Sequence, residues 1–255
     1  MYDRIRCIRD CEECLPVCEF ISKKTSSGPT IEIDRSRCTN CGRCVRACPT
    51  KALHLAGESV SVEEVMLQVE RDTCFYKNSG GGITLSGGEP LFQHKFARDL
   101  LRRSKERGIH TVLDTSGFAE WTLLEEVVEF ADLILYDLKC VDDTMHRELT
   151  GASNKLILEN AMRLSRRNIP MIIRIPIIPG MNDEEKEIGR AARFIRGLDS
   201  VPGVELLPYH RLGASKYPAL GRKYSIEHVA HASKGHVDRI RSSLKCLGID
   251  ASVVV

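Results

Sequence analysis

Cysteines are the residues of this sequence whose type and spacing most directly indicate chemistry. The chain has 255 residues and 11 cysteines, and eight of these cysteines fall within the first 48 residues. Cys38-x2-Cys41-x2-Cys44-x3-Cys48-Pro49 has the spacing of the bacterial ferredoxin run that binds a 4Fe–4S cluster. Zinc sites usually stop at Cys-x2-Cys pairs, so the longer run favours a cluster. The N-terminal residues lack the apolar segment of a signal peptide, so a disulfide framework is not expected.

A second copy of this cysteine run occurs nearer the N-terminus. Residues 6–18 align with residues 37–48, with one extra residue in the first copy. In two-cluster ferredoxins the fourth cysteine of each run binds the other cluster. We therefore predict two 4Fe–4S clusters with crossed ligands, which are Cys38, Cys41, Cys44 and Cys18 for one, and Cys7, Cys11, Cys14 and Cys48 for the other. The single residues Cys74, Cys140 and Cys246 are expected to be inert core residues.

The remainder of the chain alternates short apolar runs with amphipathic stretches. This alternation predicts a parallel α/β sheet with crossover helices. We expect a small cysteine-rich domain over residues 1–57, with a short strand at 30–33, and a larger domain over residues 58–255. In the larger domain we expect strands at 83–86, 111–114, 133–136, 171–178, 204–207 and 252–255. We expect helices there at 62–70, 94–107, 121–130, 143–148, 154–167, 184–196 and 226–246.

Five consecutive predicted strands end in polar or glycine-containing segments. Parallel α/β folds place their sites at the carboxyl ends of strands. The glycine pair of the first segment allows a ligand to approach the backbone closely. Any one segment alone is compatible with a simple turn or a surface pair, but five together indicate one shared site. The segments are SGGEP (86–90), DTSG (114–117), LYDLK (135–139), RIPIIPG (174–180) and LLPYH (206–210).

These five segments, in this order, resemble the glycyl-radical enzyme activating enzymes of the radical SAM superfamily. The cysteine-rich segment is similar to the two-cluster ferredoxin insert that many of them carry. The resemblance implies a partial (β/α)6 barrel with a ferredoxin-like domain, and S-adenosylmethionine (SAM) as cofactor beside the 4Fe–4S clusters. It also implies the residues that hold SAM. Gly87, Gly88 and Glu89 would bind the methionyl amino group, Lys139 and Arg174 the carboxylate and ribose, Ile175 and His210 the adenosyl group, and Asp114, Thr115 and Asp137 a monovalent cation.

The resemblance further implies an activity and partners. Reductive cleavage of SAM would yield a 5′-deoxyadenosyl radical that removes hydrogen from a glycine of a partner glycyl-radical enzyme, with flavodoxin or ferredoxin as reductant. Oxygen damages such radicals and clusters, which implies the cytoplasm of an anaerobe or facultative anaerobe. The formal net charge of +2 disfavours nucleic acid as a partner. No apolar run approaches the roughly 18 residues of a membrane span.

The sequence departs from the resembled family at its beginning. In that family the SAM-cluster cysteines follow the first barrel strand and precede the insert, whereas this sequence begins at the insert. We therefore expect a barrel without its first strand, through truncation, a late start or true variation, and its activity stays open. Two alternatives also stay open. In one, Cys7-x3-Cys11-x2-Cys14 is the SAM cluster of a compact radical enzyme. In the other, the chain is a non-catalytic 4Fe–4S electron carrier that binds no SAM.

Overall fold

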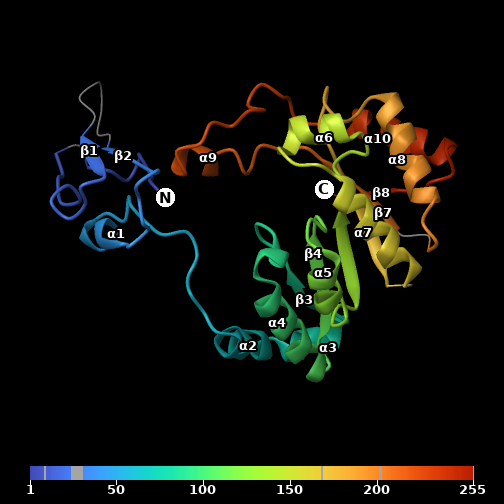
Figure 1. The fold of residues 1–255 in the computed structure, drawn as a ribbon, viewed down its shortest axis with the longest axis horizontal. Coiled ribbons are helices and arrows are strands. Elements are labelled where there is room, and N and C mark those ends of the chain that lie inside the picture. The colour runs from blue at the N-terminus through green and yellow to red at the C-terminus, as the bar shows by residue number, and fades with distance from the viewer. Residues whose placement is uncertain (9, 24–30, 168, 201–202, 255) are drawn as a thin grey trace. The chain divides into compact units, whose positions relative to one another are not determined.

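The computed structural model describes residues 1–8, 10–23, 31–167, 169–200 and 203–254. The chain divides into two compact units, and each unit is described by itself (Figure 1). The first comprises Met1–Ser59 and Arg211–His228, and the second comprises Val60–His210 and Val229–Val255. Residues 211–228, which the sequence boundary assigns to the larger domain, thus group with the first unit. Residues 30 and 255, at the ends of two predicted strands, lie outside the described residues.

The first unit has little regular structure and a small apolar core. Strand β1 (Ile21–Lys23) pairs antiparallel with β2 (Ile31–Ile33), and helix α1 (Arg43–Ala47) lies within the second cysteine run. Three side chains form the buried centre of this core: Cys14, Ile21 and Leu53. Domains of this size with few buried apolar side chains usually need metals or disulfides for stability.

The sequence repeat of the first unit is also a repeat of backbone geometry. The Cys18 N–H donates to the Leu15 carbonyl at 3.3 Å, and the Cys48 N–H donates to the Val45 carbonyl at 3.3 Å. The last cysteine of each run is therefore held by the same turn. The likeness is limited to this turn, because the second run contains helix α1 whereas the matching residues of the first run form turns.

A later segment of the chain packs onto this unit. It contains the short helix α9 (Lys216–Ala219). The Ala219 carbonyl accepts hydrogen bonds from the Tyr2 N–H and from Arg35 Nη2, both at 3.0 Å. These bonds join residues far apart in the sequence and explain why 211–228 belongs to the first unit.

The second unit is built on a six-stranded parallel sheet, which confirms the predicted α/β fold class. The strands lie in chain order from β3 to β8 (Figure 1). Every neighbouring pair is parallel. The strands are β3 (Gly82–Leu85), β4 (His110–Thr115), β5 (Leu133–Asp137), β6 (Met171–Ile177), β7 (Gly203–Pro208) and β8 (Ser252–Val253).

Helices connect these strands, mostly where the sequence predicts them. Helix α2 begins at a reciprocal capping box, in which Ser61 and Glu64 hydrogen-bond each other's backbone N–H. The last long helix begins at residue 234 rather than 226, because the Ser233 side chain caps it by accepting from the His236 N–H. The elements α1, α3, α9, β1 and the 3-10 turn η1 were not predicted. The helical elements of the unit are α2 (Val62–Arg71), α3 (Thr73–Ser79), η1 (Pro90–Gln93), α4 (His94–Glu106), α5 (Trp121–Val128), α6 (Asp143–Thr150), α7 (Lys155–Arg166), α8 (Glu185–Arg196) and α10 (Lys234–Cys246).

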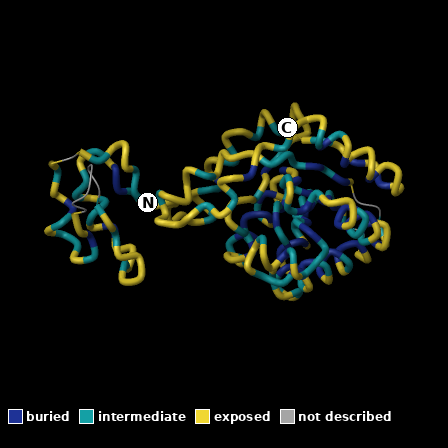
Figure 2. Tube along the Cα trace, turned by 90° about the horizontal axis from the view of Figure 1, so that it is seen from above, coloured by how far each residue is buried: buried dark blue, intermediate teal, exposed yellow. Residues whose placement is uncertain are grey.

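One face of the sheet forms the hydrophobic core of the second unit. Along β6, alternate residues from Met171 to Ile177 are buried, and the residues between them are only partly buried. Arg174 therefore lies on the face opposite to Ile173 and Ile175. Figure 2 shows the buried residues concentrated inside this unit, with the exposed residues around them.

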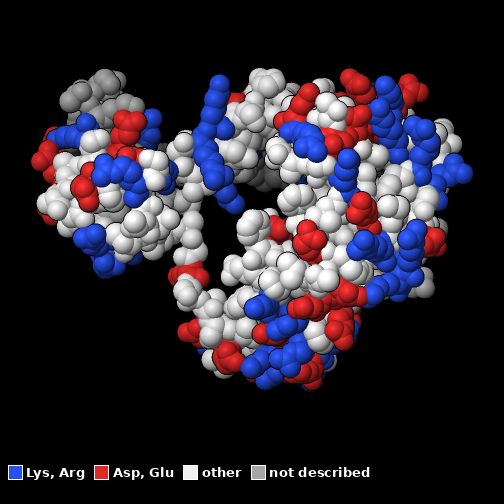
Figure 3. Space-filling model, viewed as in Figure 1, with Lys and Arg blue, Asp and Glu red and all other residues white. Residues whose placement is uncertain are grey.

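The two units differ in charge. Residues 1–59 and 211–228 together contain 14 Lys and Arg against 9 Asp and Glu, and the second unit contains 23 against 26. The first unit is thus formally positive and the second negative. Figure 3 shows both signs interspersed on the visible surface. Among the described residues, no helix is both long and apolar enough to cross a membrane.

A glycine-to-alanine change tests the packing at the end of β4. Gly117 has a φ of 68°, and a Cβ atom there would overlap the hydroxyl and ring of the buried Tyr136. We predict that Gly117→Ala lowers the free energy of unfolding by about 2–3 kcal/mol. Gly189, inside α8, has open space around its Cα, so Gly189→Ala should leave stability unchanged or raise it slightly. Urea unfolding of both variants checks this, and equal midpoints would contradict the packing described.

Candidate functional site

A cavity lies at the carboxyl ends of β3, β4 and β5. Its volume is about 200 Å³. Seven of the ten residues predicted to hold SAM or a cation line it, which are Gly87, Gly88, Glu89, Asp114, Thr115, Asp137 and Lys139, together with Ser86 and Ser116. Because parallel strands end at the same edge of their sheet, segments far apart in the sequence meet there.

The Glu89 side chain joins the first two strand ends. Its carboxylate accepts hydrogen bonds from Thr115 Oγ1 at 2.5 Å, from the Ser116 N–H at 3.0 Å and from Ser116 Oγ at 2.5 Å. It also accepts from the Leu91 N–H at 3.2 Å, which caps η1. A carboxylate offers about four lone-pair positions, so these four donors occupy them. In this arrangement the Glu89 carboxylate fixes the loop after β3 to the end of β4. The backbone polar groups of Gly87 and Gly88 are then the groups of this loop that could bind a ligand.

Asp114 and Arg174 form an ion pair beside the cavity. Arg174 Nη1 donates to Asp114 Oδ2 at 3.0 Å, and Ser86 Oγ donates to the same oxygen at 3.0 Å. Arg174 Nε lies 3.6 Å from Glu205 Oε2 on the neighbouring strand β7. Both members of the Asp114–Arg174 pair are about four-fifths buried. The guanidinium is thus anchored, although Arg174 does not line the cavity itself.

Lys139 is the cation that lines the cavity. Its Nζ lies 3.2 Å from Asp137 Oδ2, and its side chain is 35% exposed. The cavity therefore combines three carboxylates, Glu89, Asp114 and Asp137, with the cations Lys139 and Arg174 at or beside it. The resulting formal charge is −1, which suits a ligand with one net positive charge.

Ile175 and His210 are placed differently from the other predicted residues. The Ile175 side chain is 3% exposed and belongs to the hydrophobic core, so only its backbone is available on the side of Arg174. His210 is exposed and follows β7, whose hydrogen bonding continues through the Tyr209 N–H to the Ile177 carbonyl at 3.1 Å. Neither residue lines the cavity.

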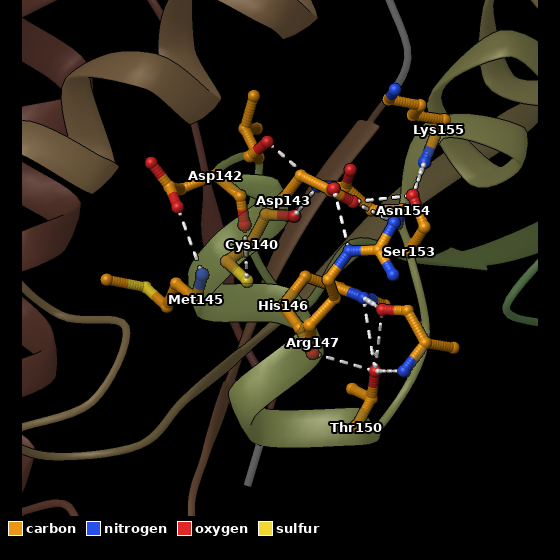
Figure 4. A network of polar contacts seen from close by, with 12 residues as sticks. Cys140, Asp142, Asp143, Met145, His146, Arg147, Thr150, Ser153, Asn154 and Lys155 are labelled. Carbon is orange, nitrogen blue, oxygen red and sulfur yellow. Dashed lines mark hydrogen bonds and ion pairs between the residues drawn. The ribbon is translucent and has the colours of Figure 1, made fainter.

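Buried polar side chains support the strand-end loops, and sequence reasoning missed all of them. Asn160 Nδ2 donates to the carbonyls of Gly117 and Ala119, both at 2.8 Å. Figure 4 shows the network around α6, in which Asn154 lies beside Cys140. Asn182 and Glu187 are the other two buried polar side chains, and the side chains of Asn154, Asn160, Asn182 and Glu187 are at most 3% exposed. Nothing in the sequence distinguishes these residues from surface asparagines and glutamates, since their role depends on tertiary contacts.

Several ionisable groups of the network around α6 have shifted pKa values, among them Asp143 and Cys140. Hydrogen bonds from Ser153 Oγ and Arg147 Nε lower the pKa of Asp143 to about 2. Burial raises the pKa of the Cys140 thiol to about 12. Asp143 is therefore ionised and Cys140 is a neutral thiol near neutral pH. Cys140 is buried, as predicted for a core residue. Cys74 and Cys246 are exposed, so the prediction that they are core residues was wrong, because they occupy solvent-facing positions of α3 and α10.

An apolar cavity adjoins the polar one. It has a volume of about 160 Å³ and shares Ser116 and Lys139 with the first cavity. Phe118, Ile157 and Ala152 supply its apolar lining, with His146 and Thr150. His146 is 3% exposed, and its Nδ1 lies 2.7 Å from the Ala152 carbonyl. The site thus has a polar compartment and an apolar one side by side.

The eight N-terminal cysteines gather in two groups within the first unit. Cys18, Cys38, Cys41 and Cys44 line one cavity. In the other group, burial raises the pKa of the Cys14 thiol to about 11, and the nearby thiols of Cys11, Cys48 and Cys7 contribute to that rise. Each group combines three cysteines of one run with the fourth cysteine of the other run.

Cysteine thiolates are the ligands that hold 4Fe–4S clusters. Within the described residues, no set of three or more His, Cys, Asp or Glu side chains is arranged to hold one metal ion. At Cys41, hydrogen bonds from Arg43 lower the pKa of the thiol to about 7, which favours the thiolate that iron requires.

Comparison with known sequences and structures identifies the family. The profile of the radical SAM superfamily matches residues 36–192, and that of the 4Fe-4S dicluster domain matches residues 6–52. The isethionate sulfite-lyase activating enzyme of Oleidesulfovibrio alaskensis is 43% identical over 227 residues, which are 87% of this chain and 73% of the relative. The choline trimethylamine-lyase activating enzyme of the same organism is 35% identical over 260 residues, covering 100% of this chain and 83% of the relative.

A solved structure supports the same assignment. A domain of the pyruvate-formate lyase-activating enzyme from Bacteroides vulgatus superposes with a TM-score of 0.58 at 33% identity, covering 69% of this chain and 99% of that domain. The same chain that has these relatives also has the polar cavity at the strand ends and the two groups of cysteines. The chain therefore belongs to the radical SAM superfamily and, within it, to the activating enzymes of glycyl-radical enzymes, whose cofactors are 4Fe–4S clusters and SAM.

Proposed function

We propose that the cavity at the carboxyl ends of β3, β4 and β5 binds SAM, and that the chain activates a glycyl-radical enzyme. The observation that carries this proposal is the convergence of the glycine pair, two aspartates and Lys139 on one cavity, whose charged lining residues, with Glu89, sum to a formal charge of −2. SAM bears a sulfonium, an ammonium and a carboxylate, so its net charge is +1. A partly enclosed site of opposite charge favours such a ligand.

Individual residues would take separate parts of SAM. The backbone of Gly87 and Gly88 would accept the methionyl ammonium, because glycine leaves its carbonyl groups accessible. Lys139 would bind the carboxylate, with Arg174 on the ribose side. Asp114, Thr115 and Asp137 would hold a monovalent cation beside that carboxylate. Glu89 would act by tying the loops of β3 and β4 together, since four donors already occupy its carboxylate.

The adenosyl group would be contacted by β6 and by the segment after β7. On β6 the backbone of Ile175 would make the contact, because its side chain is buried on the other face. After β7, His210 would make it. When bound, SAM and a reduced 4Fe–4S cluster supply the 5′-deoxyadenosyl radical that takes hydrogen from a glycine. The protein residues orient SAM and limit the access of water to it.

We further propose crossed ligand sets for the two clusters in the first unit. Cys18 would complete the set of Cys38, Cys41 and Cys44, and Cys48 would complete the set of Cys7, Cys11 and Cys14. The cavity shared by the first four and the contacts around Cys14 support this pairing. A fourth thiol near Cys14 also favours a ferredoxin-type cluster over a three-cysteine SAM cluster at this position.

The proposed partners are proteins. The substrate would be a glycyl-radical enzyme, as the names of the relatives indicate. The reductant would be flavodoxin or ferredoxin, because the formal charge of the cluster-bearing unit suits an acidic electron carrier. We place the reaction in the cytoplasm, where a reducing environment protects clusters and glycyl radicals.

SAM affinity tests the site assignment. We predict that Lys139→Ala weakens SAM binding to the reconstituted protein about 10–100-fold, because a charged hydrogen bond to the carboxylate is lost. Lys155→Ala, which removes an exposed lysine at the start of α7, should leave the affinity unchanged. Equilibrium dialysis with labelled SAM measures both. Equal affinity of Lys139→Ala and the parent protein would refute the assignment.

Iron content tests the crossed ligand sets. The parent chain should bind about eight irons. A Cys18→Ala, Cys41→Ala double variant removes two ligands of the same proposed cluster, so it should retain about four irons and one cluster signal in electron paramagnetic resonance. Loss of both clusters would instead show that each run binds its own cluster. Cys246→Ala, outside both runs, serves as the control.

Radical transfer tests the activity directly. The reduced protein with SAM should generate a glycyl-radical signal in one of the enzymes that its relatives activate, such as isethionate sulfite-lyase or choline trimethylamine-lyase. 5′-Deoxyadenosine should form in proportion to that signal. SAM binding without radical or 5′-deoxyadenosine, under conditions where a known activating enzyme succeeds, would contradict the activity and leave the SAM site standing.

A further inference from the structure

The backbone that follows β5 leaves the sheet immediately before the proposed SAM-binding lysine. The last ladder bond of β5 joins the Leu138 N–H to the Arg174 carbonyl at 2.9 Å. Beyond it, residues 139–142 have no neighbouring strand, yet they pass close to buried side chains. Backbone polar groups in such a place need other partners.

Three buried side chains supply those partners. Asn182 Nδ2 donates to the Lys139 carbonyl at 2.7 Å. Asn154 Nδ2 donates to the carbonyls of Cys140 at 3.0 Å and Val141 at 2.8 Å. Glu187 Oε1 accepts from the N–H groups of Val141 and Asp142. The side chains of Asn154, Asn182 and Glu187 are 1%, 2% and 3% exposed.

Asn182 also connects this segment to β6. Its Nδ2 donates to the Pro176 carbonyl at 2.6 Å, and its Oδ1 accepts from the Ile178 N–H at 2.8 Å. Arg174 lies two residues before Pro176 on the same strand. One buried amide therefore fixes the backbone of Lys139 relative to the strand that carries Arg174.

We propose that Asn182 is a positioning residue for SAM, acting through the backbone of Lys139. It does not line the cavity, so its effect on SAM is indirect. Asn154 and Glu187 fix the next three residues in the same way. Rigid support of this kind matters because binding groups held loosely by even about 1 Å lose much of their effect. The inference rests on the proposed SAM site.

A double-mutant cycle separates positioning from general stability. In the reconstituted full chain, Asn182→Ala should weaken SAM binding about tenfold, because the Lys139 carbonyl loses its partner and the segment shifts. In a Lys139→Ala background, the same change should alter the affinity less than twofold, since the group being positioned is gone. Equilibrium dialysis with SAM gives the four dissociation constants.

Asn160→Ala provides the matched control. Asn160 is equally buried and also donates to two backbone carbonyls, but these belong to Gly117 and Ala119. If Asn160→Ala weakens SAM binding, it should do so by the same factor in the parent protein and in the Lys139→Ala background. Asn182→Ser, which keeps a donor near the Lys139 carbonyl, should bind SAM more tightly than Asn182→Ala, and it replaces that variant if Asn182→Ala does not fold.

The outcomes distinguish this inference from the SAM site itself. An equal loss from Asn182→Ala in both backgrounds overturns the positioning role and leaves the site intact. Unchanged SAM affinity in Lys139→Ala overturns the site assignment, and the positioning role with it. Faster hydrogen exchange over residues 139–142 in Asn182→Ala, together with a non-additive loss of SAM affinity, supports the proposal.

Discussion

The second unit depends on how backbone polar groups are satisfied where parallel strands end. Inside the sheet each strand is hydrogen-bonded by its neighbours, but the loops that form the site leave this ladder. Buried side chains replace it there, with Glu89 between β3 and β4, Asn160 below the β4 loop, and Asn182 between β5 and β6. Glu89 and Asn182 use most of their hydrogen-bonding capacity in this way, whereas Asn160 Oδ1 is buried without a hydrogen-bond partner among the described residues. These side chains constrain the loops that line the cavity, and constrained binding groups lower the entropic cost of binding.

The first unit is stabilised in a different way from the second. Its buried apolar centre is small, and eight thiols surround and partly form it. Two 4Fe–4S clusters at the cysteine groups would supply crosslinks among residues that are distant in the sequence, and crossed ligand sets would tie the two runs to each other. Folding of this unit and binding of its clusters are then a single process.

Much of this architecture could be predicted from the sequence. The strands stand out because apolar runs such as residues 171–177 end abruptly in Pro-Gly or in charged residues, and parallel order follows from the helices between them. The cavity residues from Gly87 to Lys139 were found because they lie at the carboxyl ends of strands or just after them. Ile175 shows the limit of this approach, since the alternation along β6 turns its side chain into the core. Asn182 could not be found at all, because its importance arises from three backbone partners that only the folded chain brings near.

The path of the chain also bears on how the cluster-bearing unit could have been acquired. The backbone passes between the two units three times, after residues 59, 210 and 228, because residues 211–228 leave the barrel strand order and pack beside Tyr2 and Arg35. A module inserted once into an ancestral gene would need only one continuous segment. Here the unit draws on two segments that are separated in the sequence by strands β3 to β7, and β8 follows the second segment. The unit is therefore discontinuous in the sequence although it is compact in the fold. Exchange of residues 1–57 alone among related genes would separate them from residues 211–228, which pack against them.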